Sequence, residues 1–183
     1  ATTSYLSRST IENAGGAFNL SLVASDSIRI EPLSGNGILR APLGSSLSFS
    51  ADTGRFWMED TSNSIWPPGG TIDIAGAGTD VGAIRTDRFN GSAGSISLSS
   101  SLYVNTGAIS SNSFNSGVGA GNGGKIVVEA NGGDLFIDDT VRSWAYTNSS
   151  NNGPGNDSGT GGDVFLSARD NITINGSIGT ASY

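Results

Sequence analysis

Few side chains in this sequence could act chemically on a substrate. The chain has no Cys and no His among its 183 residues, so thiol nucleophiles, Ser-His-Asp triads and zinc sites with Cys or His ligands are excluded. General acid–base chemistry would have to rest on carboxylates, Tyr or the single Lys125. The carboxylates, the aromatic residues and the Gly-rich loops are therefore the candidates for function.

Carboxylates lie next to each other at two expected turns, Glu59-Asp60 and Asp138-Asp139. Glycoside hydrolysis uses such acid pairs. However, the chain is short for a polysaccharide-cleaving β-protein and has few basic residues to hold an anionic sugar. We expect these acids to be solvated groups that keep the protein soluble, and we predict that the protein is not an enzyme.

Calcium binding is a secondary hypothesis. The segment from Ser158 to Phe165 matches a calcium-binding nonapeptide repeat at all but its first position. A calcium β-roll needs tandem copies, because each ion is shared between successive turns, and here the unit occurs once. We predict no resident cofactor or metal, and the calcium candidates through oxygen ligation are Asp138, Asp139, Asp157 and Asp163.

The charge balance restricts the partners. The chain carries 16 acidic and 9 basic residues, with a net charge of −7, and binding to nucleic acid needs a basic surface. No apolar run reaches the roughly 18 residues of a membrane-spanning helix. We expect neither a nucleic-acid partner nor membrane insertion.

The elements that must position these residues follow from an internal repeat. Gly, Ser, Asn and Thr make up nearly half of the chain, which is typical either of disorder or of a β-protein with many turns. Aliphatic residues at i and i+2 recur in six units, and this alternation favours the β-protein over disorder. The predicted core columns are Leu20, Leu22, Ile72, Ile74, Ile96, Leu98, Ile126, Val128, Val164 and Leu166.

Two more strands are expected in each unit. The second carries pairs such as Ile28/Ile30 and Leu102/Val104, with only Val81 in the third unit. The third begins at one aliphatic residue per unit: Ile38, Ile65, Ile84, Ile109, Val141 and Ile178. In the last four units this residue opens a hexapeptide with a hydroxyl residue two positions on and an aromatic residue five positions on.

This pattern predicts an all-β fold: a right-handed parallel β-helix, or β-solenoid, of about six three-strand coils with Gly/Ser/Asn-rich loops. We expect almost no helix and a single domain, 1–183, with an N-terminal edge segment, 1–15, and long loops at 112–124 and 147–162. An antiparallel β-sandwich is the alternative, because short strands with turn signals suit it too.

Two segments carry a family resemblance. The segments from Gly107 to Val128 and from Gly161 to Ile178 resemble the repeat unit of filamentous-haemagglutinin-like bacterial exoproteins. The resemblance implies a secreted β-solenoid at the cell surface of a bacterium, used as an adhesin, fibre or matrix component, with no catalytic residues. The chain departs from the family in lacking the Asn-Pro-Asn-Gly-type motif of its secretion domain.

Both ends of the predicted solenoid look uncapped, with Ala1, Tyr5, Ile178 and Tyr183 as the assembly ends. One hypothesis is that copies stack head-to-tail into a homopolymeric filament, with possible lateral bundling, because a heterologous contact that does not close makes a fibre. The alternative is that 1–183 is a piece cut from a longer repeat array and forms part of the shaft of an adhesin.

The aromatic residues and long loops supply a second functional hypothesis, a carbohydrate-binding surface module on the same fold. Trp57, Trp66, Trp144 and Tyr146 could stack on surface glycans or anchor a neighbouring fibre. Exposure of the Trp residues in a row along one face would favour this function. Burial would instead indicate that they cover the core.

Overall fold

The chain forms short strands and one short helix. The computed structural model describes residues 7–115, 121–147 and 159–182. In chain order its elements are α1 Arg8–Glu12, β1 Asn19–Ala24, β2 Ile28–Ile30, β3 Ile38–Arg40, β4 Ser46–Ala51, β5 Phe56–Met58, β6 Ser64–Trp66, β7 Ile72–Val81, β8 Ala83–Arg85, β9 Arg88–Phe89, β10 Ile96–Thr106, β11 Ile109–Ser110, β12 Ser113–Asn115, β13 Ile126–Ala130, β14 Leu135–Ile137, β15 Val141–Thr147, β16 Val164–Ala168, β17 Ile172–Ile174 and β18 Ile178–Ser182.

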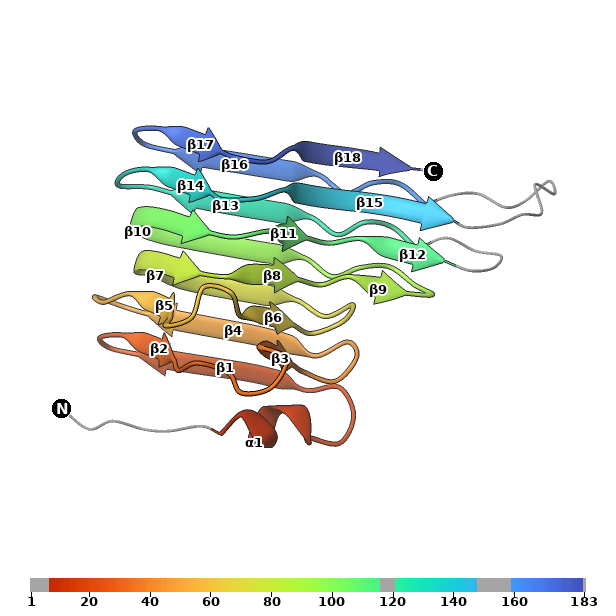
Figure 1. Ribbon diagram of the computed structural model, residues 1–183, viewed down its shortest axis with the longest axis horizontal. Coiled ribbons are helices and arrows are strands. Elements are labelled where there is room, and N and C mark those ends of the chain that lie inside the picture. The colour runs from red at the N-terminus through yellow and green to blue at the C-terminus, as the bar shows by residue number, and fades with distance from the viewer. Residues whose placement is uncertain (1–6, 116–120, 148–158, 183) are drawn as a thin grey trace.

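Consecutive strands group into six layers of three, from β1–β3 to β16–β18, which lie one above another in chain order (Figure 1). Every strand pair among the described residues is parallel. This confirms the all-β prediction with parallel pairing, and the antiparallel sandwich is wrong for this part of the chain.

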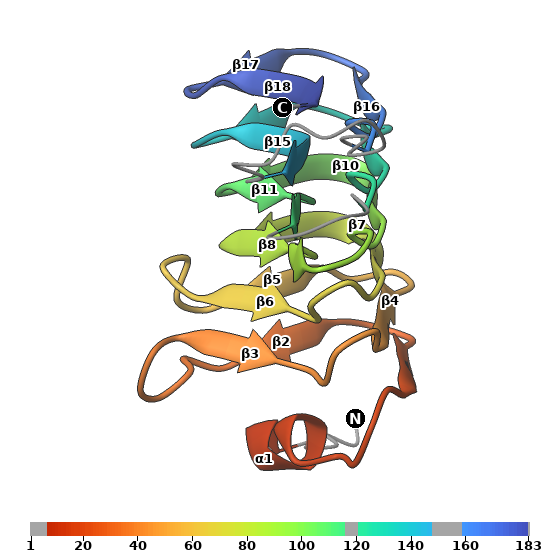
Figure 2. The same cartoon turned by 90° about the vertical axis from the view of Figure 1, so that its right-hand side faces the viewer.

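The pairing produces two sheets. The ten-stranded sheet follows β1-β4-β7-β10-β13-β16 and includes β2, β5, β14 and β17, and the eight-stranded sheet contains β3, β6, β8, β9, β11, β12, β15 and β18. Figure 2 shows β3, β6, β8 and β11 on one side of the molecule and β4, β7 and β16 on the other. One apolar core lies between them.

The register places like residues on like residues. Ile72, Ile96, Ile126 and Val164 are successive Cα partners, and Leu20 pairs with Leu47 in the first two layers. Their neighbours two positions on form a parallel column: Leu22, Phe49, Ile74, Leu98, Val128 and Leu166. Residues between these columns face outward, because side chains alternate along a strand.

Two details of the predicted repeat are wrong. In the first layer Leu39, not Ile38, pairs with Ile65 and is buried. In the fourth layer Val104, rather than Leu102, starts the second column, and Leu102 is 53% exposed.

The prediction for the second strand of each layer fails where threonine replaces an inward aliphatic residue. Thr79 and Thr106 occupy inward positions that aliphatic residues fill in other layers, and both are buried. A search for aliphatic pairs does not detect them. The predicted loop 112–124 also contains β12 at its start, Ser113–Asn115.

Part of the N-terminal end of the stack, at β3, is covered by α1, which corrects the prediction that this end is bare. Within the predicted edge segment 1–15, α1 begins after Ser7, whose side chain accepts a hydrogen bond from the Thr10 amide. Ile11 is 6% exposed and packs into the core. The Glu12 carboxylate accepts a hydrogen bond from the Arg40 amide of β3, at 3.1 Å, so α1 is fixed to the first layer.

Within the described part of the chain, none of the helices has the length and apolar character needed to span a membrane.

Candidate functional site

The outer face of the eight-stranded sheet collects most of the side chains that could bind a partner. The repeated hexapeptide builds this face, because its residues alternate between the core and the outside. Ile84, Ile109 and Val141 are successive partners at its first position and are fully buried. The second, fourth and sixth positions of each hexapeptide therefore face outward.

The hydroxyl residue at the third position faces inward and anchors the next turn of the chain. Ser143 Oγ donates a hydrogen bond to the Gly124 carbonyl at 2.7 Å and accepts one from the Gly162 amide at 3.0 Å. One layer earlier, Ser111 Oγ donates to the Gly94 carbonyl at 2.6 Å and accepts from the Gly124 amide at 3.0 Å. These hydroxyls hold successive layers in register.

Close packing explains why glycine precedes these strands. A Cβ atom on Gly124 would lie 1.9 Å from the Gly94 carbonyl oxygen. A Cβ atom on Gly94 would lie 1.6 Å from the Gly70 carbonyl oxygen. Only glycine fits where the backbones of successive layers come this close. The hydroxyl and the glycine of the repeat thus act together, in a contact that we call the hydroxyl–glycine lock.

The aromatic residue at the sixth position forms an outward row, the aromatic column of Phe89, Phe114 and Tyr146. These residues are successive Cα partners on β9, β12 and β15. The rings of Phe89 and Phe114 are stacked, with centroids 5.3 Å apart. Phe89 is 70% exposed and Tyr146 42% exposed, so an aromatic row does lie along one face.

The three Trp residues do not form that row. All are half-buried. Trp57 lies on β5 of the ten-stranded sheet, beneath the guanidinium of Arg55. Trp66 and Trp144 lie on β6 and β15 of the eight-stranded sheet, at different positions across its face. The row that would have favoured glycan binding is therefore made by other aromatic residues.

An arginine column of Arg40, Arg85 and Arg142 runs along this face, with Trp66 between Arg40 and Arg85. Arg40 is the partner of Trp66, and Arg85, Ser110 and Arg142 are successive partners. Because Ile65 pairs with Ile84, the register places Trp66 next to Arg85. The column thus crosses five layers, with arginine in the first, third and fifth.

Sequence reasoning missed this column because the nine basic residues look scattered along the chain. The available signal was an arginine directly after the inward aliphatic residue of the third strand, which occurs as Leu39-Arg40, Ile84-Arg85 and Val141-Arg142.

One carboxylate, that of Asp87, lies largely buried at this face. Burial raises its pKa above the usual Asp value, while the Asn112 amide at 2.7 Å, the Ser110 hydroxyl at 2.7 Å and the charge of Arg85 act in the opposite direction. The Asp87 carbonyl also accepts a hydrogen bond from the Trp66 indole at 3.2 Å. Asp87 therefore joins the second, third and fourth layers.

The predicted calcium ligands are not brought together. Asp138 accepts a hydrogen bond from Asn175 and Asp139 from the Thr140 amide at the turn after β14, whereas Asp163 directly precedes β16 of the next layer. Asp157 lies outside the described residues. Where the structure describes the chain, no group of three or more acidic side chains is placed to hold a metal ion.

Other carboxylates are held by neighbouring side chains. Asp80 accepts hydrogen bonds from the Tyr103 hydroxyl at 2.6 Å and the Asn105 amide at 3.2 Å, and it faces Arg55 at 3.6 Å. Desolvation and the hydrogen bond to Asp80 raise the pKa of Tyr103. This cluster links three layers of the ten-stranded sheet.

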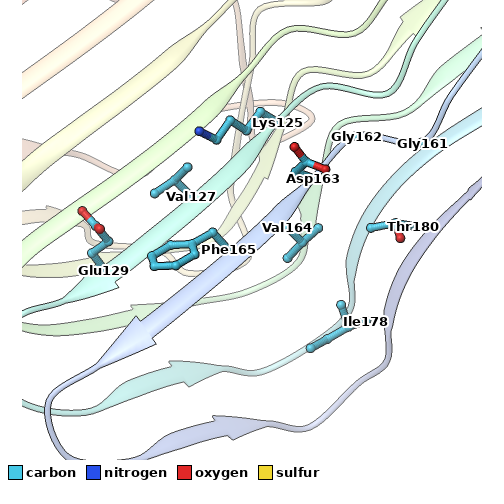
Figure 3. Close-up of a pocket in the computed structure, with 10 residues that line it drawn as sticks. All are labelled: Lys125, Val127, Glu129, Gly161, Gly162, Asp163, Val164, Phe165, Ile178 and Thr180. Carbon is cyan, nitrogen blue, oxygen red and sulfur yellow. The ribbon is translucent and has the colours of Figure 1, made fainter.

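The sixth layer leaves an open edge. Ile172 and Ile178 are 47% and 53% exposed, although their partners Leu135 and Val141 are fully buried. A hollow of about 890 Å³ lies at this edge, lined by Lys125, by residues 161–163 and by residues of β13, β16 and β18 that include Glu129, Phe165 and Ile178 (Figure 3). Of the predicted assembly ends, Ala1, Tyr5 and Tyr183 lie outside the described residues.

In comparisons with known proteins, no protein-family model, no curated protein and no solved structure matches this chain.

Proposed function

We propose that the chain is a right-handed parallel β-helix of six three-strand coils, and that it serves as a rigid, non-enzymatic rod in a surface fibre or adhesin shaft. The observation that carries this proposal is the in-register parallel stacking of the six layers, with Ile72, Ile96, Ile126 and Val164 in one continuous column. The right hand is the one expected for parallel crossover connections.

A rod of this kind suits a structural role because each layer contacts mainly its neighbours. Stacked layers make a stiff body, and they present long parallel rows of side chains to the outside. The resemblance of the segments 107–128 and 161–178 to filamentous-haemagglutinin-like repeats supports a secreted protein at the surface of a bacterium.

The two ends of the rod favour a shaft over a self-assembling filament. Ile11 and the bond from the Arg40 amide to Glu12 hold α1 over the first layer. A head-to-tail contact between copies would have to displace this helix. Ile172 and Ile178 leave a strand edge exposed, and such an edge can pair with a further layer of strands.

Negative-stain electron microscopy and sedimentation velocity at low micromolar concentration distinguish these two forms. We expect single short particles whose stacked layers measure roughly 3 nm along the rod axis, since strands stack at about 4.8 Å. Long unbranched threads would overturn the shaft in favour of the head-to-tail homopolymer.

The cellular location has its own test. Antibodies raised against the folded chain should label intact cells of the source bacterium, or its extracellular material, without permeabilisation. Labelling that requires permeabilised cells would contradict a surface role, whatever the assembly state.

A further inference from the structure

The arginine column has a regular spacing along the rod. Arg40, Arg85 and Arg142 occupy the first, third and fifth layers at corresponding outward positions. Strands stack at about 4.8 Å, so consecutive arginines of the column are roughly 10 Å apart. A partner that used all three would carry negative charges at a similar interval along a line.

Two of the three guanidinium groups are held on aromatic rings. The Arg40 guanidinium carbon lies 3.9 Å from the centroid of the Trp66 ring, and that of Arg142 lies 4.9 Å from the Trp144 ring. Stacking on a ring orients a guanidinium group and uses its face, which leaves the N–H donors in its plane free to bind a carboxylate in a bidentate manner.

These arginines, like Arg88 and Arg169 among the described residues, lack the carboxylate partners that Arg8, Arg29 and Arg55 have. Arg8, Arg29 and Arg55 form ion pairs, whereas, among the described residues, none of the arginine column lies within 4.0 Å of a carboxylate. Arg142 Nε is buried and has no hydrogen-bond partner in this part of the chain, so the terminal Nη groups of Arg142 are the donors that can reach a ligand.

The acids nearest to the column are already occupied. The Asp87 carboxylate accepts hydrogen bonds from the Asn112 amide and the Ser110 hydroxyl. The Glu12 carboxylate bonds to the Arg8 side chain and the Arg40 amide. The charge of Arg85 acts on Asp87 without an ion pair. A line of three cations therefore remains on one face of a chain whose net charge is −7, and charge complementarity indicates an anionic partner.

We propose that the arginine column binds a linear polysaccharide that carries carboxylate groups, a polymer containing uronic acid, extended along the rod axis. In an extended chain of this kind successive sugars alternate in orientation, so carboxylates on one side recur at every second sugar. Arginine recurs at every second layer, so the two repeats correspond if one sugar advances about as far as one layer, roughly 4.8 Å. The edges of Trp66 and Trp144 supply apolar contact for the sugar rings between the charges.

This binding goes beyond the proposed structural role and does not depend on it. Double-stranded nucleic acid fits less well, because its phosphates lie closer together along the axis than these arginines do. A neutral glycan would leave the unpaired guanidinium groups without a counter-charge.

The test uses polygalacturonate oligosaccharides as the probe and isothermal titration calorimetry as the readout, with dextran oligosaccharides and duplex DNA as comparison ligands. The variant Arg40→Gln/Arg85→Gln/Arg142→Gln removes the column. The matched control Arg29→Gln/Arg55→Gln removes two cations from the ten-stranded sheet. Circular dichroism checks that both variants fold.

We expect wild type to bind polygalacturonate but not dextran, and affinity to rise with oligosaccharide length until the chain spans five layers. The column variant should lose at least about tenfold in affinity, because each arginine supplies charge-assisted hydrogen bonds, while the control should change less than about twofold. Equal losses in both variants, no binding of polygalacturonate by wild type, or column-dependent binding of DNA in its place would overturn the proposal.

Discussion

Ser143 offers the sharpest test of the hydroxyl–glycine lock, because it makes two contacts that bridge layers through a single atom. In Ser143→Ala the buried Gly124 carbonyl loses its donor and the Gly162 amide loses its acceptor. A buried polar group left without a partner costs about 1–3 kcal/mol. Gly162 is half-buried, so water can partly solvate its amide. The cost of leaving this amide without a partner therefore falls at the lower end of that range.

We therefore expect Ser143→Ala to lower the free energy of unfolding by about 2–4 kcal/mol. For a domain of this size each kcal/mol lowers Tm by about 2–4 °C, so the midpoint should fall by roughly 4–16 °C. Urea denaturation followed by circular dichroism gives the free energy. Hydrogen exchange should show faster exchange in β16, the strand that follows Gly162.

Ser97→Ala is the matched control, because Ser97 is half-buried on the outer face of β10 and pairs with Asp73 and Val127. Its substitution should stay within about 0.5 kcal/mol of wild type. If Ser143→Ala is equally mild, the hydroxyl does not hold the layers together and the reasoning from the repeat fails.

Two further predictions concern the buried acid and the N-terminal cap. Because burial raises the pKa of Asp87, the folded state holds this proton more tightly than the unfolded state. Wild type should therefore lose stability relative to Asp87→Asn as the pH rises from the ordinary Asp value through the raised one. Denaturation curves between about pH 3 and pH 7 check this, and a pH-independent difference would contradict it. Ile11→Asp should cost about 1.5–3 kcal/mol and speed hydrogen exchange in α1 and β3, and unchanged exchange in β3 would show that α1 does not protect this end.

Much of the sheet structure was predictable because a strand has a strict two-residue period. Ile72, Ile74, Ile96 and Leu98 alternate with Ser and Asp, and the structure pairs them in register. The period alone could not decide between Ile38 and Leu39, since both are apolar and adjacent. There the positive φ of Gly37 ends the turn, and β3 then pairs with β6 so that Leu39 faces the core.

Other features left little or no periodic signal. The helix α1 spans five residues and buries Ile11 alone among them, too short a segment for a helical pattern. The arginine column is invisible to composition, because its members lie far apart in sequence and only the stacking of Arg85, Ser110 and Arg142 brings them into one row.

The most direct test of the central claim, in-register parallel stacking, is a disulfide between layers. The chain has no native Cys to interfere. Ser97 and Val127 are outward Cα partners on β10 and β13, so Ser97→Cys/Val127→Cys should place the two Cα atoms about 5 Å apart, within the range of a disulfide. Shifting one Cys by two residues in Ser97→Cys/Glu129→Cys gives a control at roughly 8 Å, beyond that range.

Peptide mapping after mild oxidation reads out both variants. The stacked layers predict a disulfide between positions 97 and 127 in nearly all molecules, and free thiols in the control. A control that closes as readily as the paired variant, or a paired variant that stays reduced, would contradict the stacking and with it the β-helix.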